Sequence, residues 1–269
     1  MQGNTEMNDI LITEQREAMF EIVLNRPEKR NAINNELYRA LDAAVEQAAR
    51  SDGVRAVLLR GEGKAFSAGI DVSDFLELPE SYGANWQQRA RKITEDYQRT
   101  LTKLEHLELP VIALLHGHCL GLGLELALAC DIRIAAAGTN LGLPETRLGL
   151  IPDVGGTTRL VRLVGPARAK ELIFSGRVID AALAERWGIV NHVVPPAELL
   201  AAGEALATEI FQAAPLAVGM AKRVIDGLAD IDRGLQLEGW AQSQLLASED
   251  FMEGVQSIMM RRPPDFKGR

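Results

Sequence analysis

HGHCLGLGLELALACDI, residues 116–132, is the segment around which the rest of the chain can be understood. A short apolar run, residues 111–115, comes before it and predicts a buried strand. Three glycines then predict a tight turn: Gly117, Gly121 and Gly123. From Leu122 onward the segment is apolar on nearly every side, which predicts a buried helix. The N-terminus of such a helix exposes backbone N–H groups that lack an intrahelical acceptor, and the helix dipole favours negative charge beside them.

One carboxylate, Glu125, lies one turn into this apolar helix, where burial is costly unless the group is paired or used. A dinucleotide-binding turn is excluded, because Leu126 stands where the third glycine of G-x-G-x-x-G is needed. Two interpretations stay open. Glu125 is either a hydrogen-bonded residue of a structural turn or a general acid or base beside an oxyanion site. The second interpretation needs another N–H donor and another proton-handling group elsewhere in the chain.

The composition is that of a soluble globular protein, with 269 residues, 47% of them hydrophobic and 25% charged. The net charge of −8 argues against a nucleic-acid-binding surface. Two cysteines, Cys119 and Cys130, and four histidines show neither a disulfide framework nor metal-ligand spacing. No apolar run reaches the ~20 residues of a membrane helix, and the first residues do not resemble a signal peptide. We therefore expect a cytoplasmic protein without a metal and without a nucleic-acid or membrane partner.

Strand and helix patterns alternate up to about residue 195, and only helical patterns follow. This order predicts an α/β core, residues 1–196, and a helical C-terminal region, residues 197–269. Asn34 is predicted to cap the N-terminus of a helix that continues to about residue 49. Gly165 followed by Pro166 predicts a break between two helices, because proline suits a first helical position.

Five segments match the motifs of one known family in the family's order. They are Asn25-Arg26-Pro27 with Asn31-Ala32; Phe66 to Asp71; the 116–132 segment; Leu143-Pro144-Glu145 continuing to Arg159-Leu160; and Glu253-Gly254 with Arg261-Arg262-Pro263 and Phe266. Each motif is weak alone, but five in order at the family's spacing are specific. Over nearly its whole length the chain resembles the enoyl-CoA hydratase/isomerase (crotonase) superfamily.

The resemblance implies an α/β fold in which β-β-α units repeat in a spiral and the terminal helices build trimers or paired trimers. It places the oxyanion hole on the backbone amides of Ile70 and Leu122, and the two catalytic acids on Glu125 and Glu145. This chain departs from the family pattern at Leu122, where glycine is usual. The amide still donates, because only proline would remove it.

The activity that the resemblance implies is that of an enoyl-CoA hydratase, which adds water across the 2,3 double bond of an acyl-CoA thioester. Two N–H donors stabilise the enolate-like oxygen, while Glu125 deprotonates water and Glu145 protonates C2. Asp153 is either a turn residue in Pro-Asp-Val-Gly or a third acid, as in the family's dienoyl-CoA isomerases. Isomerisation of an enoyl- or dienoyl-CoA is therefore the alternative, ahead of a CoA-thioester hydrolase or a non-catalytic binding protein.

The resemblance also implies where coenzyme A binds, largely through backbone atoms of the loop around Phe66. The expected CoA-binding residues are Arg26, Lys64, Ala65, Phe66, Ala68, Asp71, Phe266 and Lys267. Arg26 and Lys267 are the expected phosphate partners, the second across a subunit boundary. Coenzyme A enters as part of the substrate, so no separate cofactor is expected.

Apolar side chains in the C-terminal region exceed what a small helical core needs. Examples are Leu235, Trp240, Leu245 and Leu246. Exposed apolar patches of this kind usually contact a partner. Together with the resemblance, this pattern predicts a homotrimer or a homohexamer.

Overall fold

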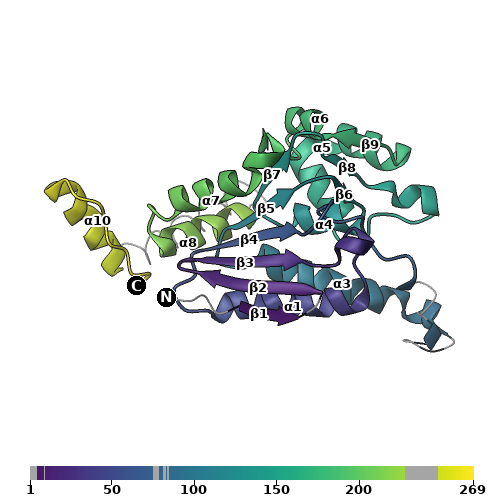
Figure 1. Ribbon diagram of the computed structural model, residues 1–269, viewed down its shortest axis with the longest axis horizontal. Coiled ribbons are helices and arrows are strands. Elements are labelled where there is room, and N and C mark those ends of the chain that lie inside the picture. Colours follow the sequence, from purple (N-terminus) through teal and green to yellow (C-terminus); the bar gives the residue numbers. More distant parts are fainter. Residues whose placement is uncertain (1–4, 9, 75–78, 81–82, 84, 228–247) are drawn as a thin grey trace.

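A seven-stranded sheet forms the centre of the protein in the computed structural model, which describes residues 5–8, 10–74, 79–80, 83, 85–227 and 248–269 (Figure 1). In spatial order its strands are β1 (Thr5–Asn8), β2 (Leu11–Arg16), β3 (Met19–Leu24), β4 (Ala56–Gly61), β5 (Val111–Leu115), β7 (Ile132–Ala136) and β10 (His192–Val194). The pairs from β1 to β3 are antiparallel, and every pair from β3 to β10 is parallel. The expected buried strand at residues 111–115 is confirmed as β5, fully buried within this sheet.

A second, smaller sheet lies beside the first and consists of β6 (His118–Leu120), β8 (Asn140–Gly142) and β9 (Val178–Asp180). The expectation of a simple glycine turn before the buried helix was therefore incomplete, because β6 lies within that turn. Two isolated bridges continue this layer toward the N-terminus. Ser67 pairs with Cys119 of β6, and Ile33 pairs with Ile70.

Helices cover the sheets and complete the repeats. The α-helices are α1 (Asn35–Arg50), α3 (Ala90–Glu105), α4 (Leu122–Leu128), α5 (Gly156–Ser175), α6 (Ala181–Trp187), α7 (Leu199–Ile210), α8 (Pro215–Asp226) and α10 (Glu249–Met260). Short 3-10 helices are η1 (Pro27–Lys29), η2 (Trp86–Arg89), η3 (Pro144–Leu148) and η4 (Pro196–Glu198). Because β5–β6–α4 and β7–β8–α5 each run from the large sheet to the small sheet to a helix, the expected β-β-α repeat is confirmed.

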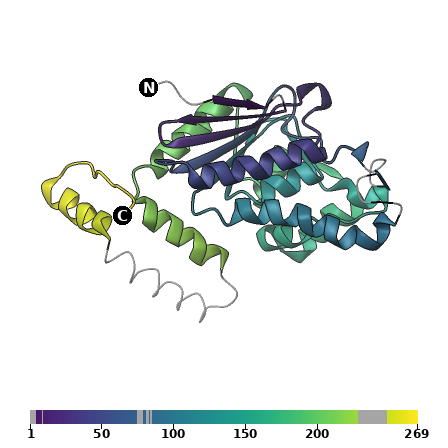
Figure 2. The same cartoon turned by 90° about the horizontal axis from the view of Figure 1, so that it is seen from below.

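Two apolar cores lie on opposite faces of the large sheet, since alternate side chains of one strand point to opposite faces. Val57 and Leu59 of β4 join the main core with α1, α3 and α4, whereas Leu58 joins a second core with α7. Figure 2 shows α1 and α3 running side by side along the same side of the sheet. Although α7 packs directly on the sheet, the proposed division at residues 196 and 197 stays a prediction.

Several local expectations are confirmed by backbone geometry. The Asn34 side chain accepts a hydrogen bond from the amide of Leu37, 2.9 Å away, and so caps α1. Gly165 has a non-helical φ of 75° inside α5, which places the expected break before Pro166.

The C-terminal helix α10 stands away from the body of the molecule, at the end opposite α6 and β9 (Figure 1). The apolar residues expected to drive assembly, Leu235, Trp240, Leu245 and Leu246, lie outside the described residues. Among the helices that are described, none combines the length and the apolar character required to cross a membrane.

Candidate active site

Two loops that are distant in sequence run side by side at the edge of the small sheet. The amide of Phe66 donates to the carbonyl of His116, 2.8 Å away, and the amide of Leu120 donates to the carbonyl of Ser67, 3.1 Å away. These bonds align the 65–71 loop with the residues that lead into α4. The N-terminal end of α4 and the residues after Ser67 are therefore brought to one place.

Gly69 and Gly121 make the close approach of these loops possible. Both have positive φ, 97° for Gly69 and 51° for Gly121, a region that other residues rarely adopt. A Cβ atom on Gly69 would lie 2.8 Å from the carbonyl oxygen of Leu120, and one on Gly121 would lie 3.1 Å from Oε1 of Glu145. Glycine is thus required at Gly69 on steric as well as conformational grounds, and at Gly121 mainly because of its positive φ.

The amides that follow these two glycines belong to Ile70 and Leu122. Neither amide donates a hydrogen bond to an acceptor among the residues that the structure describes. Leu122 is the first residue of α4, where N–H groups have no intrahelical partner. Both residues line one cavity, so the structure brings together the two amides that the sequence predicted for an oxyanion hole.

Glu125 projects from α4 into the same cavity and is only 3% exposed. Its Oε1 accepts hydrogen bonds from the amides of Val154 and Gly156, each 2.8 Å away. Burial raises the pKa of Glu125 to about 8; the hydrogen bond from Gly156 acts in the opposite direction, and the charge of Glu145 adds to the increase. The buried acid is therefore held in place by backbone donors while its proton affinity is increased.

Glu145 lies in η3, where it faces the same cavity. Its two carboxylate oxygens are buried and have no hydrogen-bond partner within the described residues. Burial raises the pKa of Glu145 to about 7, and the charge of Asp153 adds to this increase. A buried carboxyl group without a protein partner is available for a ligand or a reacting proton.

The cavity that contains both acids has a volume of about 270 Å³. Its lining is Ile70, Trp86, Ile93, Thr94, Tyr97, Leu122, Glu125, Glu145, Leu148, Leu150, Ile151, Asp153 and Val154. Leu122 is 4% exposed and joins the main apolar core, so its side chain adds to the apolar wall. A mainly apolar cavity with two convergent acids and two unpaired amides is suited to acid–base chemistry on a small acyl group.

Asp153 occupies a position that the turn interpretation did not predict. Its Oδ2 accepts a hydrogen bond from the hydroxyl of Thr94 on α3, 2.6 Å away, rather than from a nearby turn amide. The residue is exposed and lines the cavity with Glu125 and Glu145. The structure therefore places Asp153 within the acyl cavity, close enough for its charge to raise the pKa of both glutamates.

Six of the eight residues expected to hold coenzyme A lie in the 64–71 loop or against it, and of these six only Lys64 is exposed. Ala65 and Phe66 are fully buried and Ala68 is partly buried, so the side chains of Ala65 and Phe66 are not accessible to a ligand. Lys64 is exposed beside them. Arg26 and Asp71 form an ion pair with each other, with guanidinium nitrogens 3.2 Å from Oδ2 of Asp71.

Phe266 and Lys267 are not near the cavity within one chain. Phe266 packs against Gly254 of α10, and the ammonium group of Lys267 pairs with Asp265, 2.8 Å away. Because this segment follows α10, which stands apart from the body of the molecule that contains α4, the structure does not bring these two residues to the acids (Figure 1).

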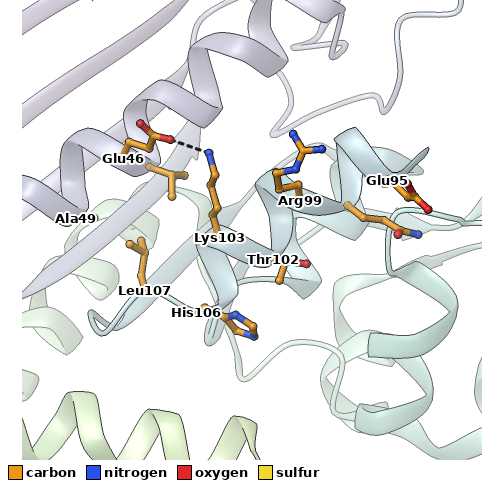
Figure 3. Close-up of a pocket in the computed structure, with 10 residues that line it drawn as sticks. Glu46, Ala49, Glu95, Arg99, Thr102, Lys103, His106 and Leu107 are labelled. Carbon is orange, nitrogen blue, oxygen red and sulfur yellow. Dashed lines mark hydrogen bonds and ion pairs between the residues drawn. The ribbon is translucent and has the colours of Figure 1, made fainter. Parts of the chain in front are cut away.

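A separate hollow lies between α1 and α3, and it contains neither of the acids (Figure 3). Its acidic, arginine and lysine side chains already form ion pairs within the protein. The ammonium group of Lys103 lies 2.7 Å from Oε1 of Glu46 and 2.9 Å from the carboxylate of Asp42. These pairs favour a structural role in joining the two helices.

Sequence reasoning missed several residues of the site. The amides of Val154 and Gly156 hold Glu125, and Thr94 and Tyr97 supply a wall of the cavity from α3. The Gly155-Gly156 pair was a usable signal, because glycines before a helix often place amides against an anion. The contribution of Thr94 and Tyr97 had no local signal, since it depends on how α3 packs.

Comparisons with known proteins extend over the whole chain. The family described as enoyl-CoA hydratase/isomerase matches residues 14–269. The chain is 41% identical over 264 residues to YngF of Bacillus subtilis, which carries an enoyl-CoA hydratase/isomerase name, covering 97% of this chain and 99% of that protein. It is 37% identical over 268 residues to the short-chain-enoyl-CoA hydratase of Clostridium acetobutylicum, covering 98% and 100%. The crystal structure of an enoyl-CoA hydratase from Bacillus anthracis superposes with a TM-score of 0.90 at 37% identity, covering 97% and 100%.

Proposed function

This chain belongs to the enoyl-CoA hydratase/isomerase family, and from that premise we propose that it is an enoyl-CoA hydratase that adds water to the 2,3 double bond of an acyl-CoA thioester. One observation carries the proposal most directly. Two carboxyl groups with raised pKa values line the same small cavity as Ile70 and Leu122, whose amides have no acceptor among the described residues. The relatives named as hydratases support the same reaction class.

The proposed reaction follows the charge that develops on the substrate. The thioester oxygen lies between the amides of Ile70 and Leu122, which stabilise it as water adds to C3 and electrons move toward the carbonyl. Glu125 accepts a proton from that water, and Glu145 donates a proton to C2. Removing a single donor from a comparable oxyanion site costs roughly 3–4 kcal/mol, so both amides matter to the rate.

The division of roles between the acids rests on their surroundings. Glu125 is oriented by two backbone donors, which suits a carboxylate that must aim at water, whereas both oxygens of Glu145 are free to face the substrate. Burial raises the pKa of Glu125 to about 8 and that of Glu145 to about 7, so the two acids together can hold one proton near neutral pH. The proposal therefore requires the proton to reside on Glu145 once substrate and water are bound.

The test of the proposed activity is a product assay. The protein is incubated separately with crotonyl-CoA and with a 3,5-dienoyl-CoA, and the products are identified by mass. Hydration adds the mass of one water, whereas isomerisation gives a product of unchanged mass that chromatography and ultraviolet absorbance distinguish from the substrate. If the protein turns over neither ester, the family activity is rejected for this chain. Release of free coenzyme A would indicate a thioester hydrolase.

We expect kcat/KM to depend on pH as a bell with its maximum between about 7 and 8. The active pair carries one proton. As pH rises through about 7, the doubly protonated pair loses a proton and becomes active, and as pH rises through about 8 the remaining proton is lost and activity falls. This dependence is measured from initial rates at subsaturating crotonyl-CoA and constant ionic strength. The pH range should extend roughly two units below the lower pKa and two units above the higher one. A rate that stays constant through both pKa values would contradict a shared-proton pair.

Asp153 supports a second candidate function, isomerisation of an enoyl- or dienoyl-CoA. It lines the cavity with both glutamates and is exposed there, so a third proton carrier is available along the acyl chain. Two carriers placed along a chain can remove a proton at one carbon and return it at another. Water addition needs only Glu125 and Glu145, and for that reason hydration is the primary proposal.

The substitution Asp153→Asn separates the two candidates. If hydration is the reaction, Asp153→Asn keeps crotonyl-CoA hydration within about tenfold of wild type, because no proton passes through this residue. Thr94→Val serves as the matched control, since it removes the same hydrogen bond from the other partner. Loss of dienoyl-CoA rearrangement in Asp153→Asn but not in Thr94→Val would instead establish Asp153 as a proton carrier.

Assembly into a homotrimer or homohexamer is a further part of the proposal. Apolar side chains on α10 are substantially exposed in the single chain, including Phe251, Met252, Val255 and Met260. Such a surface usually contacts another protein surface. We expect a sedimentation mass of three or six chains at micromolar concentration, and a mass of one chain would contradict the assembly.

Coenzyme A is proposed to bind as part of the substrate, with no separate cofactor. The backbone of the 65–68 loop and the exposed Lys64 remain the proposed contacts, with Phe266 and Lys267 contributing from a neighbouring subunit. A cytoplasmic location belongs to the same proposal. Fractionation of cells that express the protein from its own promoter tests the location.

A further inference from the structure

Residues 26–33, which we call the N-terminal cradle, contact the 61–71 loop along most of its length. The carbonyl of Arg30 accepts from the amide of Ala68, 2.9 Å away, and the carbonyl of Asn31 accepts from the hydroxyl of Ser67, 2.8 Å away. The bridge between Ile33 and Ile70 completes the contact. The cradle therefore supports the loop that supplies one of the two oxyanion amides.

Asn31 is the centre of this cradle and is completely buried. Its Nδ2 donates to the carbonyls of Glu62 and Ala65, 2.9 and 2.8 Å away, and its Oδ1 accepts from the amide of Arg26, 2.8 Å away. Its φ of 53° lies in the left-handed region, which costs free energy in most residues and less in asparagine. A conformation of this kind persists only where the surroundings hold it, which these hydrogen bonds do.

The backbone on both sides of Ile70 is held by a single residue of the cradle. The amide of Ile33 donates to the carbonyl of Gly69, 2.7 Å away, and the carbonyl of Ile33 accepts from the amide of Asp71, 2.9 Å away. In a parallel bridge of this pattern, the N–H of the residue between the two bonded groups points to the other side. The free amide of Ile70 consequently faces away from the cradle, and Ile70 lines the cavity.

The side chain that closes this arrangement is Arg26. Both of its terminal nitrogens lie 3.2 Å from Oδ2 of Asp71, the residue directly after Ile70, and one of them also donates to the carbonyl of Ala32. The two side chains are only 12% and 13% exposed. The other oxygen of Asp71 accepts from the hydroxyl of Ser73, 2.6 Å away, so both oxygens of the carboxylate are bonded within the protein.

We propose that Arg26 is a positioning residue for the oxyanion hole: by joining Asp71 to the N-terminal cradle, it fixes the direction of the Ile70 amide. The proposal rests on the proposed hydratase function and replaces the expectation that Arg26 binds a phosphate of coenzyme A. A phosphate ligand needs donors directed toward solvent. The guanidinium group of Arg26 is instead directed into the protein, toward Asp71 and Ala32.

The two roles of Arg26 predict opposite kinetic effects. If Arg26 positions the amide, Arg26→Met lowers kcat for crotonyl-CoA by about 10-fold to 100-fold and changes KM less than about twofold, because the interaction that weakens is stronger in the transition state. If Arg26 binds phosphate, KM rises and kcat is unchanged. Arg26→Lys keeps one charged partner for Asp71 and should give a kcat between those of Arg26→Met and wild type.

A matched control and a second cycle make the test specific. Arg39→Met removes an exposed arginine of α1 for which the described residues provide no ion pair, and it should leave kcat and KM unchanged. Asp71→Asn should lower kcat like Arg26→Met, and the double variant should fall no further, since both changes break the same contact. Additive losses in the double variant would overturn the pairing.

The carbonyl stretch of bound substrate tests the direction of the amide without turnover. Crotonyl-CoA labelled with ¹³C at the thioester carbon is bound to Glu145→Gln, and the infrared band is compared with that of the free ester. A shift to lower frequency reports donation to the oxygen, and in Arg26→Met/Glu145→Gln the shift should shrink. If the double variant shows the full shift, the role of Arg26 is overturned and the oxyanion hole is not. If Glu145→Gln itself shows no shift, the oxyanion hole is overturned, and the role of Arg26 falls with it.

Discussion

Glu145→Gln and Glu125→Gln are each expected to lower kcat for hydration by about 10² to 10⁴-fold. Glutamine keeps the size of either side chain and loses the ability to accept and return a proton. Glu125→Gln can still accept the hydrogen bonds from Val154 and Gly156 through its amide oxygen, so the N-terminal end of α5 keeps its contact. KM should change little, because neither carboxylate is proposed to hold the coenzyme A moiety.

The same substitutions should alter stability in a direction set by the raised pKa values. The folded protein binds the protons of Glu125 and Glu145 more tightly than the unfolded chain, whose carboxyl groups titrate near the ordinary value of 4.5. The resulting stability is complete below pH 4.5 and is lost as pH rises through about 7 and 8. Each glutamine variant should therefore gain in melting temperature relative to wild type between pH 5 and pH 9.

Steady-state kinetics, together with thermal unfolding at both pH values, measure these effects. Glu209→Gln, on the exposed side of α7, is the matched control and should change neither rate nor pH dependence. Wild-type turnover in either cavity variant would reject the two-acid mechanism. A loss of activity accompanied by a fall in melting temperature at every pH would indicate that the acid was structural.

The predicted site residues that the structure brings together are those in which one residue type and one position define the expected role. Glu125 in an apolar helix and the amides next to Gly69 and Gly121 depend on local conformation, and the structure brings them together with Glu145 in one cavity. The strand at residues 111–115 and the cap at Asn34 were predictable for the same reason, since their signals are local.

What the sequence did not predict depends on pairing between distant segments. The strands of the small sheet have three residues each, too short for an alternating pattern to stand out. The sequence predicted that Arg26 binds a phosphate of coenzyme A. In the structure its partner is Asp71, which lies 45 residues later in the chain. The sequence left Asp153 as either a turn residue or a third acid, and it did not predict the hydrogen bond to Thr94, which depends on the packing of α3.

The second large effect is expected from removing the backbone N–H of Leu122, the other proposed oxyanion donor. One substitution can remove this N–H and keep helix α4 in place. Leu122 is the first residue of α4, the position at which proline is favoured because its fixed φ suits the helix and its missing N–H is not needed there. Gly121 before it has φ 51° and ψ −129°, outside the helical region that a following proline disfavours. Leu122→Pro should therefore preserve α4 and remove one donor from the cavity.

We expect Leu122→Pro to lower kcat by about 10² to 10³-fold, the usual loss when one oxyanion donor is removed. Leu122→Ala is the matched control, because it also truncates the buried side chain but keeps the N–H. Both variants lose stability from the cavity left in the core, at a cost of about 2–5 kcal/mol. The ratio of their kcat values consequently isolates the hydrogen bond to the thioester oxygen. Equal rates in the two variants, measured on protein shown to be folded by circular dichroism, would mean that the Leu122 amide does not stabilise the transition state and that the oxyanion is held elsewhere.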